Sequence, residues 1–194
     1  DMVAALPTIE ALKAAYPNAE IHVMCSAISV PLFEAHPAVD KCLVTYWGPT
    51  ERLQNMRECF KALRKNRYDV YIACWNHPTL AYMSWLAKIP VRIGDKAKWP
   101  TRHYYTHLVD AQPNNFTQHQ LIANLTHLLP LNIPIKDPIR KLYISEAAKE
   151  TAQKEIQHIL KPNTRLIAIC VATGGSNYPI PINTIIDFIK GLDK

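Results

Sequence analysis

No apolar run in this sequence approaches the ~20 residues that a membrane-spanning helix needs, and no secretory signal opens the chain. We therefore expect a soluble, cytoplasmic protein whose contact with a membrane is at most peripheral. Internal repeats and low-complexity tracts are also missing. Hydrophobic residues make up 48% and charged residues 20%, so the chain has enough apolar surface to offset its entropy, which excludes a disordered protein.

Metal-binding patterns are absent too. No Cys-x-x-Cys pair occurs, and the five cysteines are spread along the chain, mostly in apolar or amphipathic segments. Reduced, packed thiols have this distribution, whereas a disulfide framework does not. His103 and His107 stand at helical spacing, but the stretch around them lacks both the glutamate and the periodicity of a zincin.

Several catalytic signatures are missing as well. The sequence holds no Walker loop, no Gly-x-Gly-x-x-Gly, no nucleophile elbow, no kinase motif and no Asp-x-Asp of metal-dependent sugar transferases. The net charge of +6 favours an anionic partner, such as a nucleotide, a phosphorylated glycolipid or an anionic membrane, although it also serves solubility alone. Nucleic acid is not expected, because no recognition motif accompanies the basic segment 52–65.

The chain instead alternates between segments of strand length and segments with helical periodicity. The expected helices are 3–15, 30–35, 52–65, 79–87 and 118–129, and the expected strands are 20–25, 41–46, 68–75 and 91–93. Residues 96–112 have no clean periodicity. Alternation with short connections predicts an α/β fold with a doubly wound, Rossmann-like parallel sheet.

A proline-rich stretch at 130–138 reads as a linker between two domains. We expect residues 1–138 to form an N-terminal domain and residues 139–194 to begin a second Rossmann-like domain. The second part holds expected strands at 141–144 and 166–171 and expected helices at 146–160 and 182–192. Asp1 enters a helical pattern directly, so we expect the first strand to be missing and the second domain to be truncated.

The loop after the strand 166–171 is a candidate phosphate site. Gly174 and Gly175 let backbone N–H groups approach an anion, and Thr173 and Ser176 add hydroxyl donors ahead of a helix. Ligands in open α/β sheets bind beyond the carboxyl ends of strands, where this loop lies. An ordinary strand-to-helix turn is the alternative.

Two further polar residues head helices. Asp1 begins the first helix, where a carboxylate serves either as a helix cap or as a general base at the edge of the sheet. His119 precedes the helix expected near 118–129, a position that suits a capping or surface role. Position alone favours the helix cap for Asp1 and a capping or surface role for His119.

Several segments of the sequence, in their order along the chain, resemble the ADP-heptose:lipopolysaccharide heptosyltransferase family, which is glycosyltransferase family 9. Asp1, the helix with Leu-Pro-Thr-Ile-Glu-Ala-Leu and the following Tyr-Pro-Asn-Ala are similar to the opening of that family, where Gly-Asp ends the first strand. Later matches are Tyr68-Asp69-Val70, Arg92-Ile93-Gly94, His119-Gln120, the strand 166–171 with its loop, and Ile180-Pro181. The resemblance covers essentially the whole chain and implies the two-domain GT-B fold.

The resemblance also implies a reaction and its partners. The family transfers heptose from ADP-heptose to the inner core of lipopolysaccharide, on Kdo-lipid A or heptosyl-Kdo-lipid A, with inversion and without a metal cofactor. Asp1 matches the general base. Thr173, Gly174, Gly175, Ser176 and Tyr178 fall where the donor phosphate binds, and the candidates for binding the anionic acceptor are Arg52, Arg57, Lys61, Arg64 and His119.

One position departs from the family. Tyr178 stands where the family commonly carries a lysine, and Ile180 stands where it carries a tryptophan. A phenol replaces a cation that would neutralise phosphate. The alternatives are therefore a related transferase with another sugar donor, or a non-catalytic relative that binds nucleotide-sugar or glycan. The truncated chain by itself is expected to be inactive.

Overall fold

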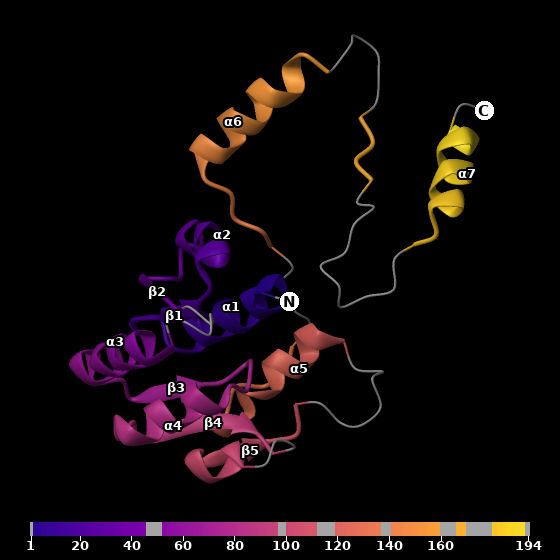
Figure 1. The fold of residues 1–194 in the computed structure, drawn as a ribbon. Coiled ribbons are helices and arrows are strands. Elements are labelled where there is room, and N and C mark those ends of the chain that lie inside the picture. The colour runs from indigo at the N-terminus through magenta and orange to yellow at the C-terminus, as the bar shows by residue number, and fades with distance from the viewer. Residues whose placement is uncertain are drawn as a thin grey trace. The chain divides into compact units, whose positions relative to one another are not determined.

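The computed structural model describes residues 2–45, 52–96, 100–111, 119–136, 141–159, 166–169 and 180–192 (Figure 1). Contacts between residues divide the chain into two units, Asp1–Ser145 and Glu146–Lys194. The domain boundary expected after residue 138 stays a prediction.

The first unit contains two parallel sheets. In one, β1 (His22–Cys25) pairs with β2 (Lys41–Val44), with His22 opposite Lys41. In the other, the order is β3 (Val70–Ile72), β4 (Val91–Asp95) and β5 (His107–Val109). Every described pairing is parallel, which confirms the predicted parallel α/β fold.

β1 and β3 are the neighbouring strands of the two sheets. The Nδ1 atom of His22 lies 2.6 Å from the hydroxyl of Tyr68, just before β3. Further along, Met24 of β1 packs against the same buried cluster as Tyr71 of β3. The strands therefore start together and run in the same direction, although the described strands of the two sheets are not hydrogen-bonded to each other.

Helices connect the strands, as an alternating pattern requires. They are η1 (Met2–Ala5), α1 (Leu6–Ala15), η2 (Ala27–Ser29), α2 (Val30–Glu34), α3 (Arg52–Asn66), α4 (Pro78–Leu86), η3 (Thr101–Tyr104), α5 (Gln120–Thr126) and η4 (Leu129–Leu131). α1 tolerates Pro7 because the first turn of a helix needs no N–H partner there. Figure 1 shows α3 and α4 side by side, and they contact each other.

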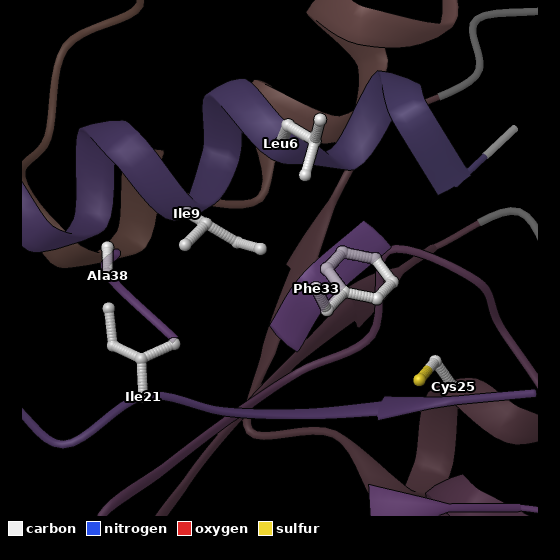
Figure 2. Close-up of a cluster of buried hydrophobic side chains, with 6 residues drawn as sticks. All are labelled: Leu6, Ile9, Ile21, Cys25, Phe33 and Ala38. Atoms are coloured by element: carbon white, nitrogen blue, oxygen red, sulfur yellow. The ribbon is translucent and has the colours of Figure 1, made fainter. Parts of the chain in front are cut away.

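Apolar residues at helical spacing bury α1 against β1. Figure 2 shows this cluster, in which Leu6 and Ile9 of α1 meet residues of β1, α2 and the turns beside them: Ile21, Cys25, Phe33 and Ala38. Residues three and four apart lie on one face of a helix, so a single stripe supplies the contact. Each of these buried side chains contributes about 1.5–3 kcal/mol if it is a large aliphatic or aromatic residue.

The structure differs from the sequence-based expectation at three strands. β5 lies within residues 96–112, where no strand was expected, and it is only three residues long. The strand expected at 141–144 is wrong, and residues 166–169 of the strand expected at 166–171 are also not in a strand. A strand needs a neighbour for its backbone hydrogen bonds, and no described segment pairs with either stretch.

The second unit contains α6 (Glu146–Gln157) and α7 (Ile182–Leu192), which confirms both helices expected there. α7 carries isoleucines at positions 182, 185, 186 and 189 along one side. Across the described ranges, no helix combines the length and apolar character that crossing a bilayer requires.

Candidate active site

The carboxyl ends of the parallel strands form the candidate site. The chain builds β2 on the far side of β1 and then returns to place β4 and β5 beyond β3, so the strand order reverses between β1 and β3. Open α/β sheets bind ligands beyond the carboxyl ends of strands at such a reversal. Asn76 follows β3 at this edge, and Asp95 ends β4.

A buried polar network fixes the edge between β3 and β4. The Tyr105 hydroxyl donates to Oδ1 of Asn76 at 2.6 Å, and Nδ2 of Asn76 donates to the backbone oxygen of Asp95 at 3.5 Å. Burial, reinforced by the Asp95 carboxylate, raises the pKa of Tyr105 above its ordinary value. The phenol therefore remains a proton donor at neutral pH, and it holds the asparagine in one orientation.

Gly94 makes this network fit. A Cβ atom at that position would overlap the ring of Tyr105. The matched Arg92-Ile93-Gly94 segment thus has a packing reason for its glycine. The ring lies directly against the backbone of β4, next to Asp95, because residue 94 has no side chain.

Trp75 is an exposed aromatic residue at the same edge, and no sequence motif pointed to it. It keeps 60% of its surface exposed, and its ring centroid lies 5.2 Å from that of His77 at the start of α4. Beyond the ends of β4 and β5, Nζ of Lys96 pairs with Oδ2 of Asp110 at 2.6 Å. The indole of Trp75 thus offers an exposed apolar ring face just after β3.

The described cysteines offer no nucleophile. Burial raises the pKa of Cys25, Cys59 and Cys74 to about 11 each, so these thiols stay protonated at neutral pH. The described cysteines are also not in disulfides, as the sequence predicted. Within the described part of the chain, no three His, Cys, Asp or Glu side chains gather as a metal site would need. Metal-free chemistry stays a prediction.

The predicted general base and all of the predicted donor-phosphate residues lie outside the described residues. The predicted base is Asp1, and Tyr178 is the residue that replaces the lysine of the family. The residues of the phosphate loop are Thr173, Gly174, Gly175 and Ser176. Asp1 directly precedes η1, whose helical turn leads into α1. The roles of all six stay predictions.

The predicted acceptor-binding residues do not form one cluster. Arg57, Lys61 and Arg64 are exposed on α3, while Arg52 begins that helix and its side chain is outside the described set. His119 caps α5, where its Nδ1 accepts a hydrogen bond from the backbone N–H of Leu121 at 3.2 Å. α3 packs with α4, whereas α5 packs with α1. Acceptor binding by these residues stays a prediction, and His119 has a structural role beside it.

A second polar cluster joins parts of the first unit that are far apart in sequence. Nε2 of His36 lies 3.3 Å from Oε1 of Glu10, and the Tyr143 hydroxyl donates to the same oxygen at 2.7 Å. The rings of His36 and Tyr143 meet edge to face with centroids 4.7 Å apart. The cluster anchors residues 141–145 to α1. The sequence did not predict this cluster, because Glu10, His36 and Tyr143 are far apart in it.

A comparison with curated proteins finds a similar sequence. Over 191 residues the chain is 25% identical to lipopolysaccharide heptosyltransferase 3 of Escherichia coli. The match covers 88% of this chain and 53% of that protein. The chain is similar in sequence to this lipopolysaccharide heptosyltransferase. It spans about half the length of this heptosyltransferase, 53%. No family model matches the chain.

Solved structures superpose on this chain and share its α/β, GT-B-like fold. A glycosyl transferase family 9 protein from Veillonella parvula superposes with a TM-score of 0.80 at 18% identity, covering 98% of this chain and 56% of that one. ADP-heptose lps heptosyltransferase II of Escherichia coli superposes with a TM-score of 0.71 at 21% identity, covering 99% and 57%. The predicted fold class is confirmed by these neighbours.

Proposed function

We propose that this chain is part of a glycosyltransferase of lipopolysaccharide biosynthesis that moves heptose from ADP-heptose to the inner core. The acceptor would be Kdo-lipid A or its one-heptose extension. The observation that carries this proposal is the 25% identity over 191 residues to a lipopolysaccharide heptosyltransferase. The parallel strands with a polar carboxyl edge support it, because nucleotide-sugar enzymes of this fold bind ligands at such an edge. We place the reaction on the cytoplasmic face of the inner membrane.

In the proposed mechanism, Asp1 acts as the general base. Its carboxylate takes the proton of the acceptor hydroxyl as that oxygen bonds to the anomeric carbon of the donor. The bond from this carbon to the phosphate oxygen breaks on the opposite face, which inverts the configuration and releases ADP. Inverting glycosidases use the same arrangement with water as the nucleophile.

The donor loop stabilises the leaving group in this scheme. Backbone N–H groups at Gly174 and Gly175, with the hydroxyls of Thr173 and Ser176, receive the charge that develops on ADP. No metal takes part. Tyr178 replaces the lysine common in the family and supplies a hydrogen-bond donor without a charge.

Two groups of exposed residues would bind the acceptor. Arg57, Lys61 and Arg64, exposed on α3, attract the carboxylate and phosphate groups of the acceptor. The exposed indole of Trp75 at the carboxyl edge of β3 offers a face for an acceptor sugar. Replacing Trp75 with alanine is expected to raise KM for acceptor more than it lowers kcat.

The test measures ADP release by the complete gene product with ADP-heptose and each of the two acceptors. Release that requires one acceptor supports the heptosyltransferase proposal and identifies the core step. The Asp1→Asn variant should then lose turnover while it still binds the donor, since only the base is removed. Unchanged turnover by that variant would remove Asp1 from the mechanism.

Tyr178 motivates the alternative functions. Without the usual cation, the protein would be a related transferase with another sugar donor or a relative that only binds nucleotide-sugar or glycan. If the folded gene product releases no ADP with either acceptor, other nucleotide-sugars are tried next. A Tyr178→Lys variant that gains turnover with ADP-heptose would trace the difference to this position.

A further inference from the structure

The outer face of α4 is apolar and exposed. The helix Pro78–Leu86 has no charged residue, and it buries Leu80, Ala81 and Met83 against the unit. Its opposite side keeps Tyr82, Trp85 and Leu86 exposed by 37%, 46% and 40%. Surface helices of globular proteins place charged and polar residues on that side. α4 therefore presents a face that the fold itself does not use.

Tyr104 of η3 extends this face into a cluster. The rings of Tyr82 and Trp85 stack with centroids 5.8 Å apart, and Tyr104 lies 5.4 Å from Tyr82 and 5.9 Å from Trp85. Together, Tyr82, Trp85, Leu86 and Tyr104 form what we call the aromatic surface. Contiguous exposed apolar groups of this kind mark interaction sites.

Cationic residues flank the aromatic surface in the sequence. Between Asp69 and Asp110 the sequence contains a single acidic residue, Asp95, and that residue is buried. Lys88 and Arg102 are exposed next to the surface in sequence. Lys88 also adopts a left-handed backbone with φ 59°, where glycine would be free of strain.

The neighbouring helix α3 adds more cations. Leu63 of α3 and Met83 of α4 share one buried cluster, so the two helices lie against each other. The exposed charged residues of α3 are Arg57, Glu58, Lys61, Arg64 and Lys65, among which only Glu58 is acidic. Aromatic and basic groups thus occupy adjacent helices.

The aromatic surface lies away from the candidate active site. α4 begins at the carboxyl edge, after His77, and runs back along the sheet. Tyr104 is held near the start of β4, where Nε of Arg92 donates to its backbone oxygen at 2.6 Å. None of the four residues of the aromatic surface belongs to the hydrogen-bonded network of Asn76, Asp95 and Tyr105.

We propose that the aromatic surface, together with Lys88 and Arg102 next to it, docks the protein on an anionic lipid bilayer. Tyrosine and tryptophan favour the headgroup level of a membrane, where an apolar ring and a polar group are both accommodated. Lysine and arginine next to them are attracted by anionic headgroups. This docking does not depend on the identity of the donor or the acceptor.

Charge argues against a second copy of the chain as the occupant. A two-fold contact through this surface would bring Lys88, Arg102 and the α3 cations of both copies together. Like charges across an interface oppose association. An anionic bilayer instead complements both the aromatic rings and the cations.

The test is co-sedimentation of the chain with vesicles of phosphatidylcholine alone or of equal parts phosphatidylcholine and phosphatidylglycerol. We expect binding to the anionic vesicles, weakened by salt. The double variant Tyr82→Ser/Trp85→Ser should lose about tenfold or more in apparent affinity, because it removes the apolar anchors. The control Ile28→Ser, at a residue 91% exposed on η2, should bind as the unchanged chain does.

A second double variant distinguishes a loss of binding from a loss of folding. Lys88→Glu/Arg102→Glu leaves the rings in place and should also reduce binding to anionic vesicles, and far-UV circular dichroism checks that both variants fold. Binding unaffected by either double variant, or no binding of the chain to anionic vesicles, would overturn the proposal. So would a concentration-dependent dimer that the Tyr82→Ser/Trp85→Ser variant abolishes, or protection of Trp85 by soluble glycan in place of vesicles.

Discussion

Two glycines of this chain stand in opposite environments. A Cβ at Gly94 would overlap the Tyr105 ring, whereas a Cβ at Gly191 in α7 would meet nothing within 4 Å. We expect Gly94→Ala to lower the free energy of unfolding by about 1–3 kcal/mol, because the ring must move. Gly191→Ala should leave it unchanged or raise it slightly, since alanine is the better helix former. Urea unfolding of both variants measures the difference, and equal effects would contradict the close packing at Gly94.

His36 makes stability depend on pH. Burial lowers the pKa of this imidazole from its ordinary value near 6.5, with Glu10 acting in the opposite direction. The unfolded chain therefore binds the proton more readily. Stability from this group is complete above about pH 6.5 and is lost as the pH falls through the lower folded pKa. We expect the free energy of unfolding to fall with pH in that window.

His127 adds to the same trend, because burial also lowers its pKa. The single variants His36→Gln and His127→Gln should each flatten the pH dependence, measured by urea unfolding at several pH values. A slope that neither variant changes would assign the effect to other groups.

At the scale of elements, helices were easier to predict than strands. α3 and α7 appear where apolar residues repeat at helical spacing, because one face of each helix carries that pattern. β5 escaped prediction because it is three residues long and only Val109 of it is buried. The stretch 141–144 has the residues of a strand, but its Tyr143 packs on α1 by its side chain, and no described strand pairs with it.

The segment 141–145 should detach when its anchor is removed. Tyr143→Phe deletes the hydrogen bond to Glu10, which we expect to cost about 1 kcal/mol and to speed proteolytic cleavage in this segment. Limited proteolysis with mass spectrometry locates the cut. Tyr16→Phe is the matched control, since that exposed hydroxyl makes a long 3.3 Å contact with Leu131. Equal cleavage of both variants would mean that the ring of Tyr143 alone holds the segment.

At the scale of the whole molecule, the order of elements was predictable and the arrangement of site residues was not. Alternating strands and helices give parallel sheets for general reasons of connectivity. Which side chains meet at the carboxyl edge depends on packing between distant segments, such as Tyr105 on Gly94. The position of His119 suited a capping or surface role, and the structure shows that it caps α5.

The chain by itself is expected to release no ADP from ADP-heptose. It spans 53% of the length of the curated heptosyltransferase that it matches. Turnover of the 194-residue chain and of the complete gene product, measured side by side with acceptor, tests this expectation. Turnover by the shorter chain at a comparable rate would mean that the donor is bound within these residues.

The stacked rings of Tyr82, Trp85 and Tyr104 also have an optical consequence. Both phenols lie within 6 Å of the indole, so excited tyrosines pass their energy to Trp85 in the folded state. Unfolding of α4 from η3 would separate them and restore tyrosine emission. Energy transfer from Tyr82 and Tyr104 to Trp85 would therefore report on the structure of the surface that we propose meets the bilayer, without an attached dye.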